Sequence, residues 1–174
     1  MSTTATPQAE ALWFLNNLAR VHLSGDETDD RVGVVEVTGA PGDMPPLHVH
    51  HEDVEGFLVL EGELTLYVSG EQPVRLGPGD WVTAPRGVPH VYEVTSPEPA
   101  RWIGVSTPAR FDRLVTEVSE PAQRNDLPPA DTQIDPERVA AVAAEQGIEI
   151  LGPPGTRCLP GGARGCTSPA SSRS

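Results

Sequence analysis

Two histidines separated by one residue, His48 and His50, constrain this chain more than any other feature. Successive side chains of a β-strand point to opposite faces, so this spacing places both imidazoles on one face of a strand. A carboxylate follows at Glu55 and a further imidazole at His90. Three imidazoles and a carboxylate form a ligand set that suits divalent transition metals. The sequence therefore predicts a metal site held by His48, His50, Glu55 and His90.

Short runs rich in β-branched residues, with Gly and Pro between them, fill the chain from Arg31 to about Arg110; examples are VGVVEVTG, EGFLVLEGELTLYVSG and VPHVYEV. Turns are expected between them at Gly62, Gly70, Gly79 and Gly87. Strands at this even spacing are typical of an antiparallel sandwich or small barrel. We therefore predict a mainly β fold whose interior holds the histidines.

Two apolar runs, Leu12–Leu15 and Leu18–Leu23, precede the predicted barrel. We expect them to form strands at a sheet edge or at an interface between two subunits. They could equally cover the barrel of their own subunit, because a long exposed sheet edge needs covering in either case.

The sequence pattern changes after the barrel. Apolar residues recur at helical spacing within 108–119, which predicts a first helix. Asp135 before Pro136 is typical of a helix start, and Gly147 of a helix end. The IEILGPPG segment then closes the folded part near Gly155.

Four segments result from these patterns: an N-terminal extension over 1–30, a barrel over 31–107, a helical segment over 108–155, and a tail over 156–174. We expect the start of the chain to be flexible and the tail to be disordered. Cys158 and Cys166 lie in this tail, where they could pair or remain inert, and inertness is the favoured interpretation.

The composition excludes several function classes. A formal net charge of -13 and a pI near 4.6 disfavour binding to nucleic acid and to anionic membranes. All 12 basic residues are arginine, which excludes Schiff-base chemistry through lysine. The N-terminus lacks the features of a signal peptide, so a cytoplasmic protein is expected.

Two motifs give the chain a recognisable pattern. The first runs from Gly42 over five residues to His48-x-His50, over four residues to Glu55 and over six to Gly62. The second runs from Gly79 over five residues to Pro85-x-Gly87 and over two to His90; its usual final Asn is replaced by Val94. Residues 31–107 thereby resemble the cupin superfamily. The resemblance implies a double-stranded β-helical barrel, jelly-roll-like, with one metal in its mouth.

Within the cupins, the segments HVHHEDVEGFLVLEGEL, GDWVTAPRGVPH and DPERVAAVAAEQGIEILGPP resemble the bacterial single-cupin proteins similar to quercetin 2,3-dioxygenase. The resemblance implies one divalent metal per chain (Ni, Co, Mn, Fe, Cu or Zn) bound by His48, His50, Glu55 and His90. It also implies that Glu55 is the base that takes a proton from a flavonol hydroxyl, after which the enolate binds the metal and reacts with O2. Cupins of this kind are commonly homodimers.

Two other functions remain open. One is a non-redox metal enzyme, a polyketide-type cyclase or an isomerase, in which the metal acts as a Lewis acid. The other is a metal-dependent cupin that binds a small molecule without turnover.

The pocket around the metal is expected to be apolar and aromatic. Strand alternation turns Phe57 and Val59 inward beside Glu55, and it places Tyr92 on the same face as His90. Trp81 and Trp102 are expected to pack in the barrel, with either able to floor a substrate pocket. His51, Glu52 and Asp53 are expected to form a solvated rim, and His22 to lie at the surface or an interface.

Overall fold

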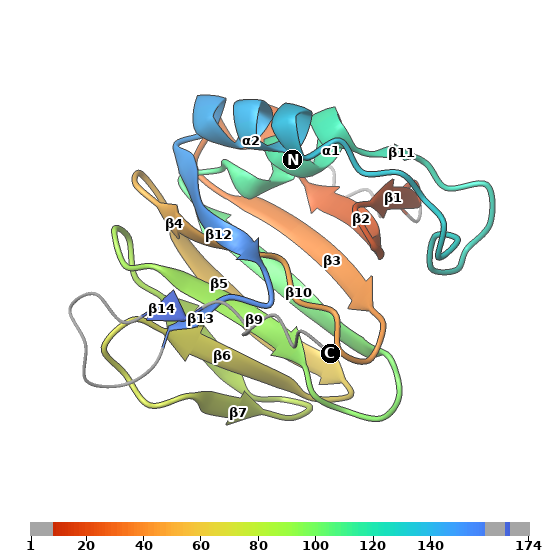
Figure 1. Cartoon of the computed structure of the whole chain (residues 1–174). Helices are drawn as coiled ribbons and strands as arrows, with labels where there is room; N and C mark the ends of the chain where they lie inside the picture. Colours follow the sequence, from red (N-terminus) through yellow and green to blue (C-terminus); the bar gives the residue numbers. More distant parts are fainter. Residues whose placement is uncertain (1–8, 159–165, 168–174) are drawn as a thin grey trace.

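The computed structural model describes residues 9–158 and 166–167, and it is built mainly from antiparallel strands (Figure 1). A seven-stranded sheet has the order β11 (Glu120–Pro121), β1 (Leu12–Phe14), β2 (Asn17–Leu23), β3 (Gly33–Gly39), β10 (Ala100–Thr107), β5 (Val54–Glu61), β8 (Trp81–Ala84). A five-stranded sheet has the order β12 (Ile148–Pro154), β4 (Pro46–His50), β9 (His90–Val94), β6 (Leu64–Val68), β7 (Val74–Leu76). The prediction of a mainly β cupin-type barrel is confirmed.

The core forms between the two sheets because inward positions alternate with outward ones along each strand. In β3 every second residue is buried, from Gly33 to Gly39. Val35 and Val37 of that strand meet Leu64 and Leu66 of β6 in one apolar cluster, in which all four are at most 2% exposed. Burying an aliphatic side chain of this size contributes about 1.5–3 kcal/mol, so this cluster holds the sheets together.

Glycine is required at the turn after β5. Gly62 has a φ of +71°, a left-handed conformation that side chains rarely adopt. A Cβ atom there would also lie 2.8 Å from the Cα of Ala100, which is backbone and cannot move aside cheaply. Close packing of this turn against the start of β10 therefore depends on the absence of a side chain.

The N-terminal strands belong to the sheet of their own subunit. β1 and β2 form a hairpin, and β2 pairs with β3 of the barrel, Val21 opposite Val35. The structure shows this segment covering the sheet of its own chain, and its use at an interface between two subunits stays a prediction. Residues 1–8, expected to be flexible, lie outside the described residues.

Both predicted helices form, as α1 (Phe111–Val118) and α2 (Pro136–Glu145). The side chain of Asp135 accepts hydrogen bonds from the backbone nitrogens of Glu137 and Arg138, both at 3.1 Å, so it is the predicted N-cap. Gly147 follows the helix with a φ of +74°. The two helices lie at the same end of the sheets (Figure 1).

The segment after α2 does more than close the fold. β12 pairs with β4, with Ile148 opposite His50 and Ile150 opposite His48. Further on, β13 (Arg157–Cys158) pairs with β14 (Cys166–Thr167), with the Cα of Cys158 opposite that of Cys166. Residues 159–165 and 168–174 of the tail expected to be disordered lie outside the described residues.

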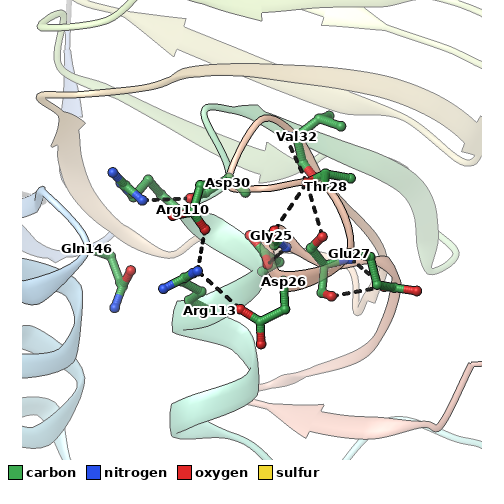
Figure 2. A network of polar contacts seen from close by, with 12 residues as sticks. Gly25, Asp26, Glu27, Thr28, Asp30, Val32, Arg110, Arg113 and Gln146 are labelled. Atoms are coloured by element: carbon green, nitrogen blue, oxygen red, sulfur yellow. Dashed lines mark hydrogen bonds and ion pairs between the residues drawn. The ribbon is translucent and has the colours of Figure 1, made fainter.

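A polar network fixes the loop around the short 3-10 helix η1 (Gly25–Glu27) to α1. Figure 2 shows Arg113 of α1 directed toward Asp26 and Asp30 of this loop, and its Nη2 lies 3.2 Å from Oδ1 of Asp26. The buried carboxylate of Asp112 accepts a hydrogen bond from the backbone nitrogen of Gly25 at 2.8 Å. The loop is therefore fastened to the helix by one buried and several exposed contacts.

Trp81 departs from the expectation. Its side chain is 52% exposed, on the edge strand β8, instead of packing in the barrel. The indole covers Gly56 so closely that a Cβ there would lie 2.2 Å from its ring atoms. Trp102, in contrast, is 2% exposed and belongs to the core.

Candidate metal centre

The four predicted ligands come together from three strands and both sheets. His48 and His50 lie on β4, His90 lies opposite His48 on β9, and Glu55 comes from β5 in the facing sheet. One side-chain ligand atom of each residue lies within 4.8 Å of the others, a group that can hold a metal ion. The site thus depends on how the two sheets face each other.

The second ring nitrogen of each histidine has an acceptor. Nδ1 of His48 lies 2.8 Å from the carbonyl oxygen of Pro46, and Nδ1 of His90 lies 3.0 Å from that of Val88. Because a carbonyl oxygen only accepts, each Nδ1 carries a proton, which leaves Nε2 as the ring nitrogen available to a metal. Metal-binding histidines are commonly oriented in this way.

The third histidine is oriented by a carboxylate. Nδ1 of His50 lies 2.8 Å from Oδ2 of Asp53, and the two residues are 1% and 0% exposed. The expectation that Asp53 belongs to a solvated rim is wrong, because the turn between β4 and β5 directs it inward. An acidic residue three positions after a candidate ligand was the available signal.

The ligand atoms converge on Glu55. Its Oε2 lies 3.3 Å from Nε2 of His50 and 3.2 Å from Nε2 of His90. Nitrogen and oxygen donor atoms gathered this closely in a buried site need a positive charge among them, supplied either by a proton on an imidazole or by a metal ion. The donor set of three nitrogens and one oxygen therefore fits a divalent transition metal.

Burial and neighbouring groups set the charge states. Burial, assisted by His90 and His50, lowers the pKa of His48 to about 3, so this imidazole is neutral at neutral pH. Burial opposes ionisation of Glu55, but His50 and His90 outweigh it and lower the pKa to about 2. Burial likewise opposes protonation of His50, yet Glu55 and Asp53 raise its pKa.

The other two histidines lie apart from this centre. His51 is exposed, and its Nε2 lies 2.8 Å from Oε2 of Glu149. Nε2 of His22 lies 3.0 Å from Oε2 of Glu36, at the outer face of β2 and β3. Glu52 is also exposed, with its carboxylate beside Arg110. These residues match the surface positions expected from the sequence.

An apolar chamber adjoins the ligands. His48, His50 and Glu55 form part of its wall, and three of the four residues expected in the pocket line it as well: Phe57, Tyr92 and Trp102. Val59 is not among the lining residues; it is fully buried in the core, two positions further along β5. The prediction that Val59 points inward is therefore confirmed, but Val59 lies too deep in the core to line the chamber.

The rest of the chamber wall comes from segments outside the barrel motifs. The N-terminal hairpin supplies Phe14 and Leu15, α1 supplies Phe111, and β12 supplies Ile148 and Ile150. Phe14 and Phe111 meet edge to face, with ring centroids 5.7 Å apart. Spacing within the motifs gave no signal for these residues, because they are brought in by tertiary packing.

Tyr92 presents its ring to the chamber while its hydroxyl is held from behind. The hydroxyl donates to Oδ2 of Asp43 at 3.1 Å and accepts from Nδ2 of Asn17 at 3.3 Å. Burial, followed by the charge of Asp43, raises the pKa of Tyr92 well above its usual value. The phenol is therefore neutral and fixed, and its ring stacks edge-on against Trp102 at 4.8 Å.

The arrangement of strands, turns and ligands matches a known family. Residues 35–106 match the family model described as Cupin domain. The chain belongs to the cupin superfamily. Val94, where the cupin pattern usually has Asn, is 2% exposed, and its backbone is hydrogen bonded to Gly42 and Asp43, each at 2.9 Å. The departure from the pattern thus leaves the backbone pairing at this turn in place.

Three known proteins illustrate what this cupin is similar to. It is 32% identical to quercetin 2,3-dioxygenase from Bacillus subtilis over 145 residues, 83% of the chain, and spans 42% of that protein's length. A predicted oxalate decarboxylase from Thermotoga maritima matches 62% of the chain and 99% of its own, with a TM-score of 0.54 and 18% identity, which shows the fold alone. KdgF from Halomonas sp. matches 56% of the chain and 85% of its own, with a TM-score of 0.49 and 22% identity.

Within residues 9–158 and 166–167, no helix is both long and apolar enough to span a membrane.

Proposed function

We propose that this cupin is a metal-dependent dioxygenase that acts on a flavonol-like or other enolisable, phenolic substrate, with O2 as the second substrate. The observation that carries the proposal is the position of Glu55, a buried and ionised carboxylate between two metal-facing imidazoles at the wall of an apolar chamber. The 32% identity to a quercetin 2,3-dioxygenase supports it.

In this proposal His48, His50, His90 and Glu55 hold one divalent transition metal. When bound, a redox-capable ion supplies the electron-transfer chemistry with O2. The neutral state of His48 suits ligation, because no proton has to leave the imidazole before it binds. Ni, Co, Mn, Fe and Cu are candidates, and Zn is the candidate for a non-redox reaction.

Glu55 acts as the general base. The pKa of its carboxylate is low because of His50 and His90, while burial alone would raise it. When Oε2 turns away from these imidazoles toward the chamber, burial becomes the dominant effect on the pKa of Glu55. The pKa then rises, so the carboxylate is a stronger base as it approaches the substrate. It then takes the proton from the substrate hydroxyl.

The chamber wall orients the substrate and excludes water. Phe57 and Trp102 are at most 3% exposed and give flat apolar surfaces beside the ligands. A planar aromatic substrate packs on such surfaces, and a dry site strengthens the electrostatic interactions of the enolate formed there. Tyr92 contributes its ring to the same wall.

Oxygen uptake by metal-reconstituted protein tests the proposal. Fe, Mn, Co, Ni, Cu and Zn forms are offered a flavonol, and substrate loss is followed alongside O2. We expect uptake equal to flavonol loss in at least one redox-capable form, with loss of uptake in His50→Ala and in Glu55→Gln. Glu52→Gln, at an exposed carboxylate three residues away, is the matched control and keeps wild-type uptake.

Absence of uptake in every form, despite one tightly bound metal per chain, would contradict the dioxygenase proposal. Turnover without O2 would then indicate a Lewis-acid cyclase or isomerase, and binding without turnover a small-molecule-binding cupin.

A homodimer and a cytoplasmic location stay predictions from the sequence. Light scattering on the purified protein checks the first, and fractionation of the source cells checks the second.

A further inference from the structure

An open apolar groove lies beside the metal chamber, under helix α2. It has a volume of about 450 Å³ and is lined by the β1–β2 turn, the segment before β4, α2 and β12. Among the described residues the exposed large hydrophobic side chains are Val74, Trp81, Ile134 and Leu151. Two of these four, Ile134 and Leu151, line this groove. Half of the exposed large hydrophobic side chains among the described residues therefore lie in one groove, and exposed apolar grooves are typical of ligand sites.

The groove and the chamber share a wall. Six residues line both of them: Leu15, Asn17, Pro45, Pro46, Val139 and Ile150. The chamber alone holds about 60 Å³, whereas sites for drug-sized ligands hold roughly 300–1,000 Å³. The groove reaches that range. A ligand of several rings that reaches the metal exceeds the chamber, and the groove is the adjoining space that shares the most wall residues with it.

The charges of the groove define the kind of ligand. Asp43 is the one ionisable residue among the described residues that line it, and burial raises the pKa of its carboxyl group. Without a cationic side chain, this lining offers nothing to pair with an anion. The prolines at 45, 46, 136, 153 and 154 add flat, rigid apolar surface. The lining thus suits an uncharged, planar, aromatic group.

Leu15 stands at the junction. It is the first of the two residues of the β1–β2 turn, and it lines the chamber, this groove and a second groove toward Trp13. Its φ is +54°, a left-handed conformation that is unfavourable for a bulky side chain and is found where the surroundings enforce it. The backbone of the turn therefore holds the Leu15 side chain between the two compartments.

We propose that the groove under α2 is an outer subsite for the distal aromatic ring of an elongated, uncharged substrate whose oxygen atoms lie in the metal chamber, and that Leu15 is the gate between the two. The inference rests on the proposed function for the end of the substrate that faces the metal. The groove then selects substrates by the length of their apolar end.

Two ligands without an enolisable hydroxyl separate this inference from the chemistry. Flavone carries a distal phenyl ring that chromone lacks, and the zinc-loaded protein is used so that no oxidation occurs. Equilibrium dialysis is expected to show flavone binding at least tenfold more tightly than chromone. Ala140→Trp, which fills the groove from α2, should weaken flavone binding at least tenfold and chromone binding less than twofold.

The matched control is Ala141→Trp, which adds the same side chain at the next, exposed position of α2 and should leave both affinities unchanged. Thermal unfolding of both variants verifies that they are folded. Leu15→Gly removes the gate and accepts the left-handed backbone, so flavone association should accelerate at least threefold with metal content unchanged.

Equal binding of flavone and chromone, or equal effects of both tryptophan variants, would overturn the outer subsite. An unchanged flavone association rate in Leu15→Gly would overturn the gate. Failure of the proposed function has a different signature: the groove-dependent preference for flavone persists, and no form of the protein consumes O2 with a flavonol.

Discussion

The carboxylate of Asp53 lies 2.8 Å from Nδ1 of His50, and both side chains are excluded from solvent. This pair links the β4–β5 turn to the metal centre, because Asp53 fixes the imidazole orientation from behind while its Nε2 faces Glu55. A buried aspartate would otherwise be costly, so the histidine and the aspartate stabilise each other's burial.

Asp53→Ala is therefore expected to weaken metal binding by about 10–100-fold, the usual effect of removing a partner that orients a ligand. Asp53→Asn keeps an acceptor for the Nδ1 proton but loses the charge, and should fall between wild type and Asp53→Ala. Competition with a chromophoric chelator measures the affinities. Glu52→Gln next to it serves as control, and equal affinity in all four proteins would show that the pair is structural only.

How far the sequence predicted this site depends on which interactions are local. His48, His50 and Glu55 were predicted from spacing, because strand alternation fixes the face of each side chain. The burial of Asp53 was not predicted, because Asp53 lies in the turn between β4 and β5, where the backbone of the turn decides whether a side chain points to solvent or to the core. The pattern of alternating residues does not describe such a turn.

The chamber was predicted less completely for a related reason. Phe57, Tyr92 and Trp102 line it, and each lies on a barrel strand whose alternation could be read. Leu15 and Ile150 reach it through pairing of distant segments, β2 with β3 and β12 with β4. Such long-range pairing leaves no periodic signal within either segment.

Metal binding should stabilise the fold. An ion that binds only the native state at 100 times its Kd adds about 2.7 kcal/mol. For a chain of this size that corresponds to a Tm increase of roughly 5–10 °C. Differential scanning fluorimetry with and without chelator is expected to show this increase in wild type and in His51→Ala, but to lose it in His50→Ala. An equal increase in His50→Ala would place the metal elsewhere.

Acid should destabilise the metal-free protein. The pKa of His48 is about 3 in the native state against an ordinary 6.5, so the unfolded chain binds more protons between these pH values and stability falls as pH falls through this window. Glu55, at about 2 against 4.5, acts in the same direction below pH 4.5. His50 acts oppositely: its raised pKa contributes stability that is fully present below pH 6.5 and is lost as pH rises.

Urea denaturation of chelator-treated protein at pH 7.0 and 5.0 measures this dependence. The midpoint is expected to be lower at pH 5.0 in wild type, and the difference should shrink in His48→Gln, whose amide takes up no proton. His51→Gln, at an exposed histidine, should retain the wild-type difference. The same pH dependence in His48→Gln as in wild type would rule out His48 as its source.

The loop around η1 offers a test of buried against exposed charge. The carboxylate of Asp112 is 2% exposed, accepts from Gly25 at 2.8 Å and packs against Gly33, where a Cβ would lie 2.4 Å from its Oδ1. Asp112→Ala leaves the Gly25 N–H buried without a partner, which should cost about 1–3 kcal/mol of unfolding free energy.

Asp26, directed at Arg113 in Figure 2, is the matched exposed carboxylate, with 91% of its side chain accessible. Asp26→Ala should change stability by about 0–1 kcal/mol, because exposed ion pairs are screened and cost side-chain entropy. Urea titration of both variants checks the contrast.

Since α1 also contributes Phe111 to the chamber wall, Asp112→Ala is further expected to weaken flavone binding, whereas Asp26→Ala leaves it unchanged. Equal stability of the two variants would show that the η1 loop is held by its exposed pairs instead of by Asp112.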